Sequence, residues 1–247
     1  MNSFDPVSML VALALVALLP TLAIMTTCFL KIGVVLSLLR NALGVQQVPP
    51  NMALYGLALI LTAYVMAPVA TQISTNVTAA YNAPGNSTSY GGRSAMGTLN
   101  QGGHNAPDDA LSLMRTPDLP KLIKAVETGV EPLRGFMLRI AKPVNREFFM
   151  RTAERLWGTE QASKVKDTDF VILVPAFVVS ELTSAFQVGF LLFLPFVIID
   201  LIVSNVLLAM GMMMVSPITI SLPLKLFLFV MVDGWTRLIQ GLVLSYT

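Results

Sequence analysis

Apolar residues fill two long parts of this chain, one near its beginning and one near its end, and a polar region separates them. The apolar stretches 7–30 and 52–70 are each close to the roughly 20 residues that a helix needs to cross a bilayer. The stretch 170–215 is long enough for two helices or one hairpin, and 218–244 for one more helix. The pattern predicts an all-α membrane protein with about four hydrophobic spans arranged as helical hairpins.

Proline residues punctuate the apolar stretches, and a proline inside a helix removes one backbone hydrogen bond. We expect kinks, half-helices or hairpin tips at Pro20, Pro68, Pro175, Pro195, Pro217 and Pro223. The same pattern divides the chain into an N-terminal hydrophobic hairpin (1–70), a polar region (71–169) and C-terminal hydrophobic helices (170–247).

A short polar loop, 41–51, joins two apolar segments between residues 36 and 68, and Arg40 is the only charged residue in that stretch. Two apolar helices joined by a tight polar turn are typical of a membrane hairpin. Because basic residues favour the cytoplasmic side, Arg40 and Lys225 place the turns beside them in the cytoplasm. Residues 71–169 are then expected on the periplasmic side.

The polar region has two parts. Residues 82–107 are rich in Gly, Ser, Asn and Pro and are predicted to form a flexible insertion. From Leu119 onward, apolar residues recur every three or four positions, as on one face of a helix. Pro132 and Pro143 are expected to start new helical turns, and Glu147 and Arg151 are spaced for an ion pair on one helical face.

The composition supports the assignment to membrane proteins. Only 12% of the 247 residues are charged, 55% are hydrophobic and the mean hydropathy is +0.71, whereas a soluble domain carries about 25% charged residues. A net charge of +2 is too small to indicate nucleic-acid binding.

The single cysteine, Cys28, excludes an intrachain disulfide and is expected to be a small core residue. No basic residue precedes Lys31, so we expect the first apolar segment to be retained rather than cleaved as a signal peptide.

The sequence contains no set of residues that would support catalysis. His104 is the only histidine, and it follows two glycines in the predicted insertion. There is no phosphate-binding loop, no dinucleotide motif and no His/Cys spacing for a metal. We therefore expect neither an enzyme nor a cofactor, and any movement through the protein would be driven by another component.

Charged residues inside the C-terminal apolar stretches include Glu181, Asp200, Lys225 and Asp233. An unpaired ion in a membrane span is costly, so such residues pair with one another, line water or mark a pathway. Either acid, Glu181 or Asp200, could meet Lys225, within the chain or across a subunit boundary. A simple structural ion pair is as reasonable an interpretation as a functional one.

A run of methionines, Met210 and Met212–Met214, precedes Pro217 and is interrupted by Gly211. Methionine side chains are flexible and polarizable, so they conform to irregular partners. Gly211 and Pro217 argue against a continuous helix here. A methionine loop at a hairpin tip could seal a pore and yield to a passing chain. From composition alone, core filling is the better interpretation of these residues.

Two long segments resemble the FliP/SctR family of export-gate subunits from bacterial type III secretion systems. The first is LSLLRNALGVQQVPPNMALYGLALILTAYVMAPV (36–69), and the second is FLPFVIIDLIVSNVLLAMGMMMVSP (193–217), which LPLKLFLFVMVDGW (222–235) continues. The resemblance covers roughly 7–70 and 170–246. The Gly- and Ser-rich insertion departs from a compact family member.

The resemblance implies a homopentamer in the bacterial inner membrane that joins FliQ/SctS-type and FliR/SctT-type subunits and the large export-gate protein. The assembly would be a cone-like channel entrance, largely above the membrane plane, that passes unfolded secreted proteins. Met212, Met213 and Met214 match the family's methionine gasket, which narrows the closed pore. Glu181 and Lys225 match a charge pair between neighbouring subunits. The absent signal sequence and the residues around Arg40 and Asn51 favour an injectisome over a flagellum.

Two other functions are compatible with the residues alone. The chain could be an autonomous transporter or ion channel in contact with lipid, using Glu181, Asp200 and Lys225 as ligands in the membrane. The absence of a visible internal repeat argues against this class. It could also be an assembly scaffold without contact to a pore.

Overall fold

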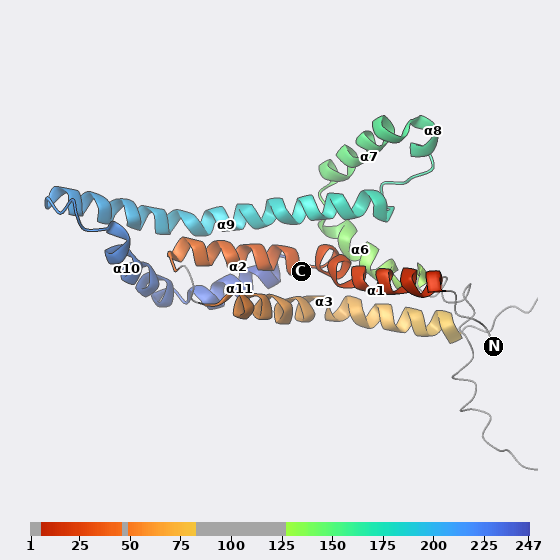
Figure 1. Ribbon diagram of the computed structural model, residues 1–247, viewed down its shortest axis with the longest axis horizontal. Coiled ribbons are helices and arrows are strands. Elements are labelled where there is room, and N and C mark those ends of the chain that lie inside the picture. The colour runs from red at the N-terminus through yellow and green to blue at the C-terminus, as the bar shows by residue number, and fades with distance from the viewer. Residues whose placement is uncertain (1–5, 46–48, 83–126) are drawn as a thin grey trace, which may run out of the picture. The chain divides into compact units, whose positions relative to one another are not determined.

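The computed structural model describes residues 6–45, 49–82 and 127–247, and within these ranges every regular element is a helix. The predicted all-α class is confirmed. In chain order the helices are α1 (Pro6–Thr26), α2 (Phe29–Leu43), α3 (Asn51–Asn82), α6 (Glu131–Ile140), α7 (Pro143–Trp157), α8 (Thr159–Ala162), α9 (Phe170–Ala209), α10 (Pro217–Met231) and α11 (Gly234–Leu244) (Figure 1).

The chain forms two compact units. The first combines Met1–Ala70 with Leu133–Thr247 and carries the residues discussed below; the second is Thr71–Pro132. The predicted flexible insertion, apart from Asn82 at the end of α3, lies outside the described residues, as does His104.

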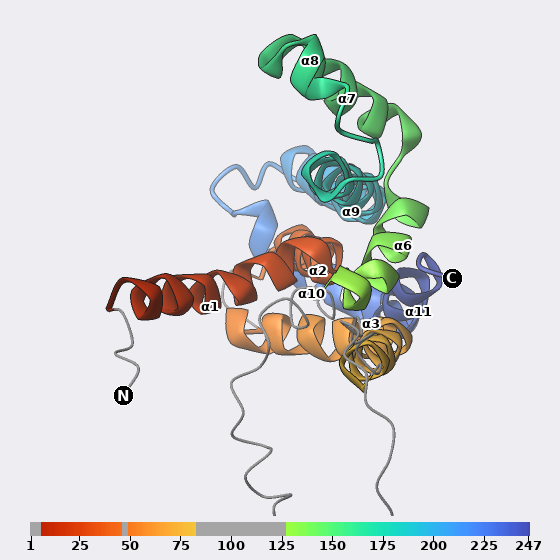
Figure 2. The same ribbon diagram turned by 90° about the vertical axis from the view of Figure 1, so that its right-hand side faces the viewer.

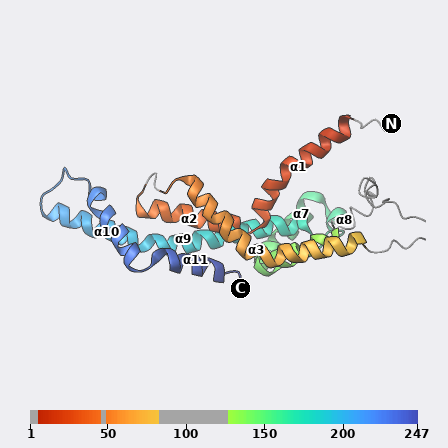
Figure 3. The ribbon, with the colours of Figure 1, turned by 90° about the horizontal axis from the view of Figure 1, so that it is seen from below.

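Two helices are long and apolar enough to cross a membrane: α3 over Asn51–Ala80, and α9. Two bent pairs qualify if each is counted as one span. Pro20–Thr26 and Phe29–Leu43 meet at 77°, a bend visible where α1 leaves α2 in Figure 3, and α10 and α11 meet at 61°. The described residues therefore hold two to four candidate spans, which agrees with the predicted four at its upper limit.

The stretch 170–215 differs from the two helices or hairpin expected there, because α9 is one helix of 40 residues. It continues through Pro175 and Pro195. A proline removes only one backbone donor, and neighbouring helices compensate for that loss in an apolar environment. At 1.5 Å per residue α9 is about 60 Å long, roughly twice the thickness of a bilayer's hydrocarbon core. The whole helix cannot be a simple span.

The core of the first unit lies where α2 packs along α9. Apolar residues of α2 recur at i, i+3, i+4 and i+7 and are fully or almost fully buried, as are those facing them on α9: Ile32, Val35, Leu36, Leu39, Leu173, Ala176 and Phe177. Gly189 allows the close approach, since a Cβ there would lie 2.3 Å from Cδ1 of Leu38. Cys28 is fully buried, as predicted.

Helices α7 and α8 lie on the side of α9 opposite to α2 (Figures 1 and 2). Pro143 is the first residue of α7, which confirms the predicted helix start, and Arg151 pairs with Glu147 as predicted. The buried Ser180 hydroxyl of α9 fixes this junction. It accepts hydrogen bonds from the Lys142 backbone N–H at 2.9 Å and from Asn145 Nδ2 at 2.7 Å.

Candidate functional site

The methionine run forms the turn between α9 and α10. Helix α9 ends at Ala209 and α10 begins at Pro217, so the predicted helix break is confirmed. Gly211 adopts the left-handed backbone conformation with φ of 73°, which glycine enters without a steric penalty. Ser216 then stands immediately before the first residue of α10.

The side chains of Met212, Met213 and Met214 are 44%, 81% and 102% exposed. They fill no core space in the described part of this chain, which argues against the core-filler interpretation. Three soft, flexible side chains in succession at the exposed end of an apolar helical hairpin can conform to whatever surface meets them. The gasket itself stays a prediction.

A polar cluster connects α9, α10 and the end of α2. Asp200 accepts hydrogen bonds from Lys225 Nζ and from the Ser221 hydroxyl, both at 2.6 Å. Lys225 and Ser221 are buried, whereas the Asp200 side chain is 40% exposed. Lys225 Nζ also lies 4.0 Å from the position of a Cβ on Gly44, the C-cap of α2. The ammonium therefore faces the helix end that carries partial negative charge.

A second polar cluster surrounds Glu181, which is completely buried. Glu181 Oε2 accepts a hydrogen bond from the Tyr246 hydroxyl. Glu181 Oε1 is buried too, and no donor reaches it among the described residues. Lys31 Nζ donates to the Ser245 hydroxyl at 2.7 Å and lies 4.5 Å from the centre of the Tyr246 ring.

Tyr246 is the centre of this second cluster. Its ring stacks on Phe136 of α6, with centroids 6.1 Å apart. Burial, followed by the nearby Glu181 carboxylate, raises the pKa of Tyr246 above its usual range, so the phenol stays protonated and can donate. Residues that follow α11 thus hold α2, α6 and α9 together.

Sequence reasoning missed Lys31, Ser245 and Tyr246. The available signal was the isolation of Lys31, which is the only charged residue between Asp5 and Arg40. A lysine inside an apolar helix needs a partner. The partner could not be identified, because Ser245 lies 214 positions away.

Glu181, Asp200, Lys225 and Asp233 have different surroundings in the structure. Lys225 has Asp200 as its partner within the chain, and Glu181 has Tyr246. Asp233 is exposed at the bend between α10 and α11, with φ of 52°, rather than enclosed in a helix. The pairing of Glu181 with Lys225 of a neighbouring subunit stays a prediction.

Large apolar side chains cover much of the surface of α9 and α10, for example Phe186, Phe190, Phe227 and Val230. Contiguous apolar surface of this kind marks contact with lipid or with other protein. The fold, with its two polar clusters between apolar helices, defines an all-α membrane protein built to lie among other apolar surfaces. Residues 12–242 match the FliP family, and the chain belongs to that family.

Its relatives match over almost their whole length. "Yop proteins translocation protein R" of Yersinia pestis is 45% identical over 242 residues, covering 98% of this chain and 97% of that protein. "Harpin secretion protein HrcR" of Erwinia amylovora is 43% identical over 245 residues, with 99% and 98% covered. "Virulence protein YscR" of Salmonella typhimurium is 37% identical over 244 residues, with 98% of each covered.

Proposed function

We propose that this chain is a core, pore-forming subunit of the export gate of a bacterial type III secretion system of the injectisome kind. It passes unfolded secreted proteins across the inner membrane. Membership of the FliP family and the secretion and virulence names of its relatives support the class. The observation that carries the pore role is the exposed triplet Met212–Met214 at the turn between two apolar helices.

In the proposed assembly several copies, five by the family resemblance, bring their α9–α10 turns together around a central passage. The methionine side chains close the idle passage to ions, and their rotational freedom lets them yield to a passing chain. FliQ/SctS-type and FliR/SctT-type subunits and the large export-gate protein complete the gate. Residues 71–169 lie on the periplasmic side, and other components of the system supply the energy.

Neighbouring subunits would be joined by Glu181 of one copy and Lys225 of the next. The buried Glu181 Oε1, which no donor reaches within the described residues, supports this proposal because a buried carboxylate oxygen normally accepts a hydrogen bond. In the single chain Glu181 accepts a hydrogen bond from Tyr246, and Lys225 donates one to Asp200. Assembly would therefore require Tyr246 to move and Asp200 to share or release the ammonium.

The proposed pore role is tested by replacing Met212–Met214 together with alanine in the assembled gate and recording ion conductance of the bacterial membrane in the absence of substrate. We expect a raised conductance with unchanged assembly, because alanine is too short to fill the passage. Met52→Ala, in another exposed methionine at 86% exposure, is the matched control. Unchanged conductance in the triple variant would exclude the seal. Ion transport by the purified chain alone in liposomes would instead indicate an autonomous channel.

A further inference from the structure

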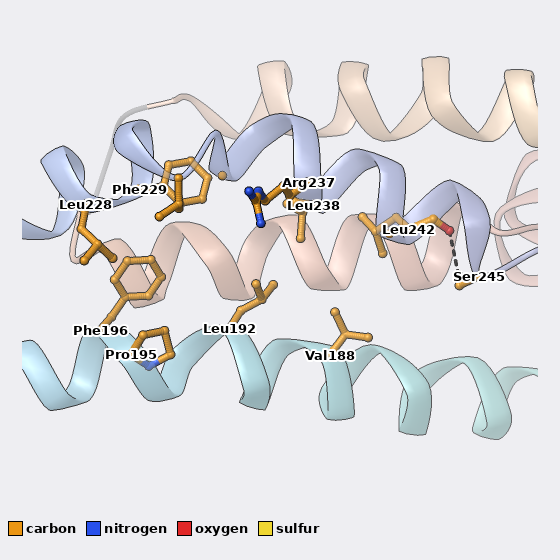
Figure 4. Close-up of a pocket in the computed structure, with 13 residues that line it drawn as sticks. Val188, Leu192, Pro195, Phe196, Leu228, Phe229, Arg237, Leu238, Leu242 and Ser245 are labelled. Atoms are coloured by element: carbon orange, nitrogen blue, oxygen red, sulfur yellow. Dashed lines mark hydrogen bonds between the residues drawn. The ribbon is translucent and has the colours of Figure 1, made fainter.

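A cavity of about 370 Å³ opens between α9 and the bent pair α10–α11. Val188, Leu192 and Phe196 of α9 form one wall, and Leu238 and Leu242 of α11 face them. Figure 4 shows these side chains pointing toward one another across the space, with Arg237 among them. The volume is in the range of ligand pockets in proteins, and the lining is almost entirely apolar.

One stripe of α11 shapes this cavity. Arg237, Gly241 and Ser245 follow one another at intervals of four residues, so they share a helix face, and all three line the cavity. A Cβ added at Gly241 would meet no heavy atom within 4 Å. The stripe therefore begins at a cation and continues into open space at Gly241.

Arg237 is the only ionisable residue in the lining. It is exposed, and no ion pair joins its guanidinium to another described residue. Its backbone N–H bonds to the Asp233 carbonyl, as expected in a first helical turn. A guanidinium matches the geometry of a phosphate group.

The residue types beside this cation are those found at a membrane–water boundary. Trp235 stands two residues before Arg237 at the bend, with its ring edge against Phe229 at a centroid distance of 5.4 Å. Tryptophan and arginine are the residue types that anchor helices at that boundary. Basic pockets between membrane helices bind anionic lipid headgroups.

We propose that this cavity binds one acyl chain of an anionic phospholipid, with the headgroup phosphate on Arg237 and the chain along Gly241 between α9 and α11. An apolar cavity alone would take any lipid, and the lone guanidinium adds the selection for an anionic headgroup. A second copy of this chain is the competing occupant. It is disfavoured because it would have to bring a carboxylate to Arg237 together with an apolar side chain. This site does not depend on the proposed gate function.

The test uses the full chain purified in mild detergent and native mass spectrometry with added dioleoyl phosphatidylglycerol or dioleoyl phosphatidylcholine, two lipids with the same acyl chains. We expect phosphatidylglycerol to be retained about fivefold more than phosphatidylcholine, the contribution of one basic residue near an anionic headgroup. Arg237→Gln should abolish this preference, and Arg237→Lys should keep most of it. An unchanged preference in Arg237→Gln would overturn the proposal.

Gly241→Leu tests the acyl-chain position separately, since its side chain enters the open space and should reduce retention of both lipids. Gly56→Leu is the matched control, because a Cβ at Gly56 also meets nothing within 4 Å but lies on α3, away from the cavity. Undiminished lipid retention in Gly241→Leu would overturn the assignment. Loss of a homodimer signal in Gly241→Leu, without any change in bound lipid, would show that a second copy occupies the cavity. This result would also overturn the lipid proposal.

Discussion

The Tyr246 hydroxyl donates a hydrogen bond to Glu181, although 65 positions separate the two residues. The acceptor is a completely buried carboxylate on α9, and the donor lies just beyond the end of α11. A buried charge is tolerated only when it is paired or hydrogen-bonded. This contact therefore links the end of the last described helix to the centre of the first unit.

The first prediction concerns the donor in this contact. Tyr246→Phe removes the hydroxyl and keeps the ring that stacks on Phe136 and lies beside Lys31. It leaves both oxygens of Glu181 without a donor, so we expect the free energy of unfolding to fall by about 1–3 kcal/mol. Denaturant unfolding in detergent, followed by circular dichroism, measures this. Tyr64→Phe, at an exposed position, should change nothing; equal stability of the two variants would contradict the assigned role.

Stability should also depend on pH in the alkaline range. The pKa of Tyr246 is raised above its ordinary value of 10.0, chiefly by burial and next by Glu181. The unfolded chain then loses the phenolic proton before the folded chain does. The contribution of this group is complete below about pH 10 and declines above it, by at most about 1.4 kcal/mol per pH unit. The difference in unfolding free energy between the natural chain and Tyr246→Phe should shrink from pH 9 to pH 11. A constant difference would exclude the effect.

The third prediction separates the two acids that can meet Lys225. Lys225→Glu places two carboxylates together in the α9–α10 cluster and should lower both thermal stability and assembly. Adding Asp200→Lys should restore stability, because it rebuilds the ion pair within the chain. Adding Glu181→Lys should restore part of the assembly, if neighbouring copies share this pair.

Native mass spectrometry of the co-expressed gate subunits gives the assembly, and thermal unfolding of the single chain gives the stability. Asp200→Asn alone should cost about 1–3 kcal/mol, less than a fully buried pair because the carboxylate is partly exposed. A full-strength complex with Lys225→Glu would contradict an interface role for this lysine.

The fourth prediction concerns the close packing of α2 on α9. Gly189→Ala places a Cβ 2.3 Å from Cδ1 of Leu38 and 3.3 Å from its Cβ. We expect a loss of about 1–3 kcal/mol from overpacking. Adding Leu38→Ala should recover part of this loss, and thermal unfolding is the readout. Gly56→Ala meets no neighbour and should stabilise the helix by about 0.5–1 kcal/mol. Equal effects at both glycines would show that α2 and α9 do not pack this closely.

Local sequence signals predicted those features that depend on neighbours along the chain. The apolar stretches predicted the helical class, and Gly211 with Pro217 predicted the turn that carries the exposed methionines. Pro195 led to a wrong expectation of a break, because one missing backbone donor does not end a helix that packs against others. The prolines favoured a break before the methionine run, whereas α9 continues through Pro175 and Pro195 to Ala209.

The partners of the buried charges could not be predicted, because they depend on how helices are rotated and shifted against one another. Asp200 and Glu181 both lie on α9, whereas Lys225 lies on α10. Only the packing of the two helices places Asp200 next to Lys225. Lys31 and Ser245 come from distant parts of the chain. The spacing of apolar residues in α2 and in α11 carries no information about such a contact.

The separation of Lys31 from Ser245 by 214 positions has a consequence for biosynthesis. At about 5–20 residues per second, the ribosome reaches Ser245 roughly 10–40 s after Lys31 has been made. During that interval Lys31, and Glu181 once it has been made, lack the hydroxyls of Ser245 and Tyr246 that receive and supply their hydrogen bonds. The polar cluster between α2 and α9 is therefore completed only after translation has passed α11, later than the residues of the apolar α2–α9 contact have been made.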